Sequence, residues 1–219
     1  MAHFDWALLE QPETQTIQDL AEKLTVSPFL ARLLWQRGIT DTNQWAAFTT
    51  PDVTSLHDPM LLHDMDKAVA RIQQAVTNQE KITIYGDYDV DGLTSTSIMK
   101  EALESIGAEP EVFIPDRFAD GYGPNADVYK YLQANGTQLL ITVDNGVGGK
   151  AVIDQAMEAG MDVVVTDHHE LPDDLPNAVA VVHPRYPGSD YPFGDLSGAG
   201  VAFKVATALL DGPPMDAVD

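Results

Sequence analysis

Three aspartates stand at alternate positions directly after an apolar, β-branched run. Asp87, Asp89 and Asp91 follow the segment 82–85 and Gly86. In an extended segment, residues two apart project to the same side, so these carboxylates are expected to converge on one point. Carboxylates held that close repel one another unless a cation lies between them, and Mg²⁺ or Mn²⁺ takes oxygen ligands of this kind. The spacing therefore predicts a divalent metal site, with an acidic, solvated loop as the alternative.

Polar side chains also follow two further apolar runs. Asp144 comes directly after 139–143, and the pair His168 and His169 comes just after 162–166. Because the carboxyl ends of parallel strands open onto the same edge of a sheet, these side chains are expected to meet the three aspartates. Taken alone, the aspartate also fits an Asx-turn and the histidines fit loop positions. Their joint occurrence predicts one shared metal site.

This set of side chains suits hydrolysis of a phosphate ester. Carboxylates combined with imidazole favour Mn²⁺, with Mg²⁺ as the second choice. The number of ligands indicates two ions with Asp144 bridging them, an arrangement used for displacement at phosphorus. Adjacent histidines point in different directions, so we assign His168 to the metal and His169 to the phosphate or leaving group. The start of the following helix, with Thr94 and Ser95, is expected to offer backbone N–H donors to a phosphate.

Strand-like and helical patterns alternate from residue 64 onward, and these elements must position the site. Strands are expected at 81–86, 112–114, 139–143, 162–166 and 179–182. Helices are expected at 64–78, 93–106, 125–132 and 149–159 and from 198 onward. Such alternation predicts an α/β fold with a doubly wound, mostly parallel sheet and helices on both faces. Before it, helical spacing of apolar residues predicts a small helical N-terminal arm. We therefore divide the chain into an arm over 1–62 and an α/β domain over 63–219.

Composition sets limits on the class of protein. The 219 residues are 44% hydrophobic, contain no cysteine and carry a formal net charge of −22. No apolar run approaches the roughly 20 residues of a membrane helix, and the N-terminus lacks a secretory signal pattern, so we expect a cytoplasmic protein without a membrane partner. The negative charge argues against broad adhesion to nucleic acid, but not against a nucleic-acid substrate held through metal ions.

The motifs together resemble the DHH phosphoesterase superfamily. They are DYDVDG at 87–92, VDNG at 143–146 and DHH at 167–169. Within that superfamily, further stretches resemble the bacterial RecJ-type exonucleases: the helical arm, LHDPMLLHDMDKAVARI at 56–72, DRFADGYG at 116–123 and YPFGDLSGAGVAFK at 191–204. The resemblance implies a 5′-to-3′ exonuclease that hydrolyses single-stranded DNA with Mn²⁺ or Mg²⁺ in recombination and repair.

The resemblance also implies roles for single residues. The metal ligands that it implies are Asp89, Asp91, Asp144 and His168. Asp87 is expected to lie beside them. His169 becomes the catalytic histidine, and Arg117 a candidate for gripping the terminal phosphate. Ser197 and Gly198 lie in a tight turn into the last helix, where binding substrate and building the fold are both open.

The chain departs from the family pattern in two ways. Tyr85 occupies the place where many members have a metal-binding histidine, so Asp87 is expected to take over that role. Relatives also continue with a further metal-binding aspartate, a second domain and a nucleic-acid-binding module. We therefore expect a first domain, incomplete at its C-terminus, that binds metal weakly alone, shows little nuclease activity and meets single-stranded DNA mainly through the missing parts. The alternatives are an oligonucleotide or cyclic-dinucleotide phosphodiesterase, a pyrophosphatase, or a metal-free scaffold relative.

Overall fold

The computed structural model describes residue 7 and residues 9–212 of the chain. It divides into two compact units, with the boundary between Leu56 and His57.

The first unit is a small group of helices with its own core. Its elements are α1 (Thr14–Leu24), α2 (Pro28–Trp35), α3 (Thr42–Thr49) and the short 3-10 helix η1 (Val53–Ser55). The hydroxyl of Ser27 caps α2, and the carboxylate of Asp41 caps α3. Apolar residues at helical spacing form the core: Ile17, Leu20, Ala21, Leu24, Ala31, Leu34 and Ile39. The predicted helical character of this part and the Asp41 cap are confirmed.

The second unit is built on a five-stranded parallel sheet. Along the sheet the strands are β2 (Glu111–Phe113), β1 (Ile82–Tyr85), β3 (Leu139–Val143), β4 (Asp162–Thr166) and β5 (Ala180–Val182). Every neighbouring pair is parallel. The chain runs outward from β1 to β2 and then returns to β3 on the other side of β1. The strand order therefore reverses between β1 and β3, and open α/β sheets bind their ligands at such a point.

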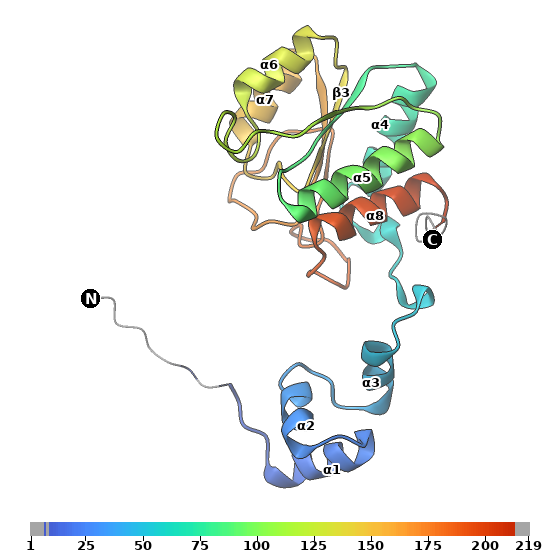
Figure 1. Cartoon of the computed structure of the whole chain (residues 1–219), viewed down its shortest axis with the longest axis vertical. Helices are drawn as coiled ribbons and strands as arrows, with labels where there is room; N and C mark the ends of the chain where they lie inside the picture. Colours follow the sequence, from blue (N-terminus) through green and yellow to red (C-terminus); the bar gives the residue numbers. More distant parts are fainter. Residues whose placement is uncertain (1–6, 8, 213–219) are drawn as a thin grey trace, which may run out of the picture. The chain divides into compact units, whose positions relative to one another are not determined.

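Helices cover both faces of this sheet (Figure 1). One face is packed by α4 (Met65–Thr77), α5 (Val90–Ser105) and α8 (Gly198–Leu209), and the other by α6 (Ala126–Ala134) and α7 (Lys150–Glu158). Within β3, Leu139 and Ile141 contribute to the first core and Leu140 to the second, as the strand period of two requires. A short 3-10 helix, η2 (Pro59–Leu61), precedes α4. The predicted doubly wound α/β architecture is confirmed.

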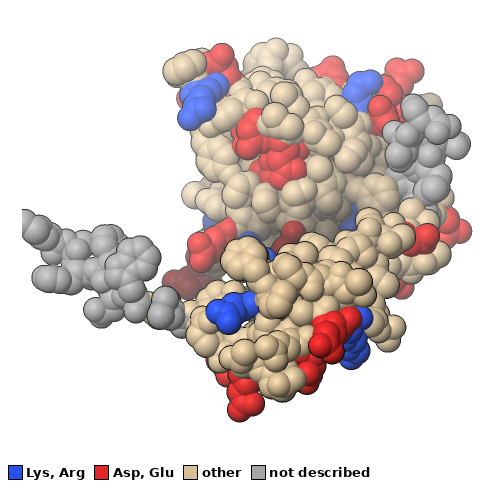
Figure 2. Space-filling model, turned by 60° about the horizontal axis from the view of Figure 1, so that its bottom comes forward, with Lys and Arg blue, Asp and Glu red and all other residues tan. Residues whose placement is uncertain are grey.

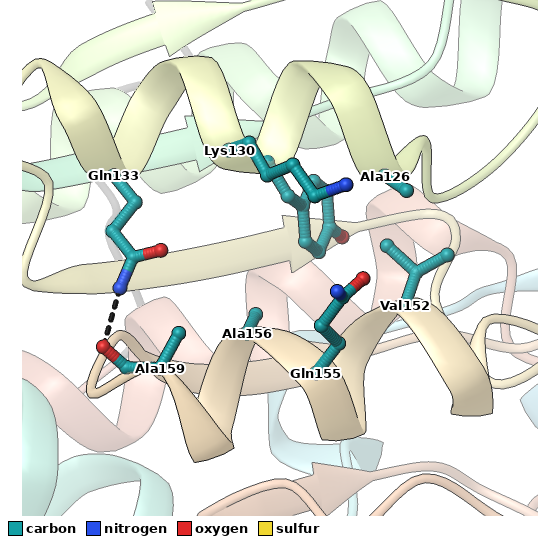
Figure 3. A pocket seen from close by; sticks show the side chains of 8 residues that line it. Ala126, Lys130, Gln133, Val152, Gln155, Ala156 and Ala159 are labelled. Atoms are coloured by element: carbon teal, nitrogen blue, oxygen red, sulfur yellow. Dashed lines mark hydrogen bonds between the residues drawn. The ribbon is translucent and has the colours of Figure 1, made fainter.

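A small pocket lies between α6 and α7 (Figure 3). Small side chains line much of it, among them Ala126 on α6 and Val152 and Ala156 on α7. The side-chain amide of Gln133 closes one end by donating to the carbonyl of Ala159 at 2.5 Å. None of the lining residues is one of the predicted site residues, so this pocket is separate from the strand ends described below.

The surface carries mostly acidic charge. The sequence has 34 acidic and 12 basic side chains, and on the face shown in Figure 2 the basic groups of the described residues stand apart from one another. In the described ranges, the structure contains no helix that is long and apolar enough to cross a membrane.

Candidate metal centre

The first carboxylates lie where β1 passes into α5. The helix begins at Val90, earlier than the sequence pattern predicts, because the Asp89 carboxylate caps it by accepting from Gly92 N at 2.9 Å. Asp91 consequently lies in the first helical turn. The expectation that Asp87, Asp89 and Asp91 share one extended segment is therefore wrong, and their side chains reach the site from different backbone conformations.

Asp87 is buried against the start of α5. Its side chain is 2% exposed, and a Cβ at Gly92 would lie 2.5 Å from the Asp87 Cβ, so only glycine fits there. Burial raises the pKa of Asp87, and the nearby charge of Asp89 adds to that rise. Carboxylate oxygens of Asp87, Asp89 and Asp144 all lie within 4.8 Å of one another. The structure thus brings these three predicted ligands together.

Asp144 lies at the middle of the cluster, directly after β3. Its backbone is left-handed (φ 61°), and its N–H donates to the Thr166 carbonyl of β4 at 3.0 Å. Its side chain is 2% exposed, and its Oδ1 has no hydrogen-bond partner among the described residues, although His168 Nε2 lies 3.1 Å away. Burial, helped by the charge of Asp91, raises the pKa of Asp144 to about 7. A buried carboxylate oxygen left without a partner is suited to a bound cation.

Asp167 holds the histidine pair that follows β4. Its Oδ1 accepts from His168 N at 2.7 Å, from His169 N at 3.1 Å and from His169 Nδ1 at 2.7 Å, while Oδ2 accepts from Val147 N at 3.0 Å. Burial raises the pKa of this carboxyl, but the hydrogen bonds from His169 and Val147 outweigh it and leave the pKa lowered. Asp167 is therefore an ionised positioning group. Sequence reasoning assigned it no role, although its place directly after a buried strand was a usable signal.

The two histidine rings face different neighbours. His168 Nε2 lies 3.1 Å from Asp144 Oδ1 and 3.5 Å from Asp91 Oδ2. His169 Nε2 lies 3.0 Å from the hydroxyl of Tyr122, and the two imidazole planes are inclined by 50°. The hydrogen bond to Asp167 raises the pKa of His169, and burial opposes that rise. One ring thus points at the carboxylates and the other at a phenol that the sequence reasoning did not select.

The N-terminus of α8 closes the cluster from another side. Gly198 N and Ala199 N each donate to one oxygen of Asp91, both at 2.8 Å. A Cβ at Gly198 would lie 2.3 Å from Asp144 Oδ1, so glycine is required. The Ser197 hydroxyl caps the helix. These contacts tie α8 to two carboxylates, and the amides at its start are already used by Asp91.

The remaining predicted substrate-binding residues differ in placement. The hydroxyls of Thr94 and Ser95 are used within α5, since each donates at 2.7 Å to the carbonyl four residues earlier, and Ser95 is fully buried. Arg117 is brought beside it, with its Cζ 5.4 Å from the ring centroid of Tyr88. Its charge partly offsets the effect of burial on the pKa of Asp87.

Tyr85 is a packing residue and not a substitute ligand. It is fully buried, stacks on Phe113 with ring centroids 5.6 Å apart, and donates from its hydroxyl to the Gly123 carbonyl at 2.9 Å. This bond anchors the loop residue that follows Tyr122. Tyr85 thus supports the loop that delivers a phenol to His169.

The comparisons with known proteins agree with this fold. The family model described as "DHH family, N-terminal domain" matches residues 81–217. The Bacillus subtilis single-stranded-DNA-specific exonuclease RecJ is 42% identical over 211 residues, which cover 96% of this chain and 27% of the relative. The Escherichia coli exonuclease of the same name is 35% identical over 202 residues, covering 92% of this chain and 34% of the relative.

Solved structures show the same similarity. RecJ from Thermus thermophilus in complex with Mn²⁺ matches with a TM-score of 0.70 and 30% identity, covering 93% of this chain and 28% of that one. A manganese-bound exonuclease RecJ matches with a TM-score of 0.63 and 34% identity, over 71% of this chain and 40% of that one. The chain spans 27–34% of the length of the two curated relatives named above.

Proposed function

This chain belongs to the DHH family, and from that premise we propose that it carries the metal centre of an exonuclease that degrades single-stranded DNA from the 5′ end. The observation that carries the proposal is the buried Oδ1 of Asp144, which has no hydrogen-bond partner in the part of the chain that the structure describes. Two further carboxylates and two imidazoles lie around it. Relatives at 42% and 35% identity that are named single-stranded-DNA-specific exonucleases support the substrate class. As part of the same proposal, we assign the activity to the cytoplasm, in recombination and repair.

The chain offers a donor set that fits Mn²⁺ or Mg²⁺. We assign Asp87, Asp89, Asp144 and His168 to the first ion, since their carboxylates and imidazole converge. Both oxygens of Asp91 already accept amides of α8, so this residue has less capacity left for a cation. When bound, the divalent ion would neutralise charge on the attacked phosphate and lower the pKa of a water.

His169 is assigned to proton transfer. Asp167 is ionised and accepts from Nδ1, so Nδ1 carries the hydrogen and the neutral ring accepts the Tyr122 proton at Nε2. The raised pKa of His169 favours the protonated ring, which can donate from Nε2 to a phosphate oxygen or to the leaving oxygen. The phenol must give up its bond to Nε2 for that transfer.

Arg117 supplies positive charge beside an otherwise acidic site. It is exposed, lies over the ring of Tyr88, and is close enough to affect the pKa of Asp87. We assign it to the terminal phosphate of the DNA, where a guanidinium can form two hydrogen bonds. The contacts of Ser197 and Gly198 support a role in building the site more than one in holding substrate.

Metal titration and a nuclease assay test the proposal. Calorimetry with MnCl₂ should show binding to the chain, and Asp144→Asn should abolish it. The protein should shorten 5′-labelled single-stranded DNA only with Mn²⁺ or Mg²⁺. Dinucleotides and pyrophosphate, assayed in parallel, test the small-substrate alternatives. Absence of Mn²⁺ binding would favour a metal-free scaffold, and preference for dinucleotides or pyrophosphate would overturn the assignment to long single strands.

A further inference from the structure

Both backbone carbonyls of the histidine pair are held by one loop that follows β5. Arg185 Nη2 donates to the carbonyl of His168 at 2.7 Å, and His183 Nε2 contacts the carbonyl of His169 at 2.8 Å. The other ring nitrogen of His183, Nδ1, accepts from Arg185 N at 3.0 Å. Because Nδ1 accepts, Nε2 carries the ring hydrogen, and His183 is the donor to His169.

The loop is fixed in place where it makes these contacts. His183 is fully buried, and β5 ends beside β4, where Asp167 N donates to the Val182 carbonyl at 3.2 Å. The stem of Arg185 lies against Gly194, at which a Cβ would approach the Arg185 Cγ to 3.0 Å. A rigid loop therefore presents both donors to the neighbouring loop.

We propose that His183 and Arg185 are positioning residues, which fix the backbone of the histidine pair and thereby direct its two rings to different tasks. The inference rests on the proposed function, because it assigns His168 to metal and His169 to proton transfer. Asp167 holds the pair through N–H groups and one ring nitrogen, whereas these two residues hold it through carbonyls. With both sides of the backbone held, neither peptide can rotate and exchange the direction of the rings.

The contact also accounts for a buried imidazole that takes no direct part in the site. A phenylalanine at His183 would leave the carbonyl of His169 and the N–H of Arg185 without their partner. In other metal sites, mutating a residue that hydrogen-bonds to a metal ligand typically lowers metal affinity or activity by about 10–100-fold. The carboxamide of glutamine, by contrast, can offer an N–H donor in place of Nε2.

Four variants of the full chain test the proposal. His183→Phe removes both ring nitrogens, His183→Gln retains a donor, and Arg185→Met removes only the guanidinium at an exposed position. His63→Phe is the matched control, because His63 also contacts a backbone carbonyl, that of Val181 within β5, but does not contact the histidine pair. Thermal unfolding establishes that each variant is folded.

Two measurements are made on each variant. Calorimetry gives the affinity for MnCl₂, and NMR of the metal-free chain gives the exchange rate of the His169 Nδ1 proton that bonds to Asp167. We expect Arg185→Met and His183→Phe to weaken Mn²⁺ binding about tenfold and to speed the proton exchange, with His183→Gln and His63→Phe close to the unmodified chain.

Unchanged affinity and proton exchange in a folded Arg185→Met or His183→Phe variant would overturn the positioning role. If the unmodified chain binds no Mn²⁺ but the proton exchange still responds to these two variants, the positioning role stands and the proposed function fails. If His183→Phe does not fold, the exposed Arg185→Met decides the matter alone.

Discussion

Replacing Asp144 by asparagine should stabilise the metal-free protein while it abolishes metal binding. Burial raises the pKa of this carboxyl from 3.8 to about 7, so ionising it in the folded chain is costly. That rise corresponds to roughly 4 kcal/mol, because one pKa unit is worth about 1.4 kcal/mol. Asparagine has nearly the same shape and no charge, so it removes this cost and also removes the anionic ligand.

The pH dependence follows from the direction of the pKa change. Between pH 4 and 7 the folded chain binds more protons at Asp144 than the unfolded chain does, so its stability falls as pH rises through that range. Above pH 7 the stability contributed by the proton on Asp144 is fully lost. The asparagine variant lacks this contribution, and the difference between the two proteins should grow from near zero at pH 4 to a few kcal/mol at pH 8.

Urea unfolding of chelator-treated protein measures the effect. All 7 tyrosines lie at or beyond residue 85 and all 3 tryptophans lie at or before residue 45, so the tyrosine near-UV signal reports the second unit. Asp173→Asn, at an exposed position of the same unit, is the matched control. Equal pH slopes of stability for Asp144→Asn and the unmodified chain would refute the costly ionisation of this buried carboxyl. Mn²⁺ affinity retained by the variant would refute its role as a metal ligand.

Three further substitutions probe other contacts in and around the site. Asp167→Asn should lower the pKa of His169, because its hydrogen bond is the main cause of the raised value, and an NMR titration of the ring reads this directly; a value that stays raised would contradict it. Gly198→Ala places a Cβ 2.3 Å from Asp144 Oδ1 and should cost about 1–3 kcal/mol in urea unfolding together with weaker Mn²⁺ binding; normal affinity would show that α8 can move away. Tyr85→Phe leaves the buried carbonyl of Gly123 without its donor and should lower the free energy of unfolding by about 1–3 kcal/mol, which thermal unfolding measures. An unchanged stability would mean that water replaces the hydroxyl.

The amino-acid sequence was sufficient for the sheet and for the location of the site. Apolar runs buried on both faces and the helices between them specify a parallel doubly wound sheet, because the two periods are local properties of the chain. Polar residues directly after β1, β3 and β4 then had to meet at one edge, since parallel strands end on the same side. Asp87, Asp89, Asp144 and His168 are where this reasoning expects them.

The tertiary structure decided which of the neighbouring groups act on those ligands. Asp91 is held by amides of α8, the His169 ring by Asp167 and Tyr122, and the backbone of the histidine pair by His183. Several of these hydrogen bonds join residues far apart in the sequence, and no period or spacing encodes them. They exist only because packing of the sheet and helices brings separate loops to within about 3 Å of one another.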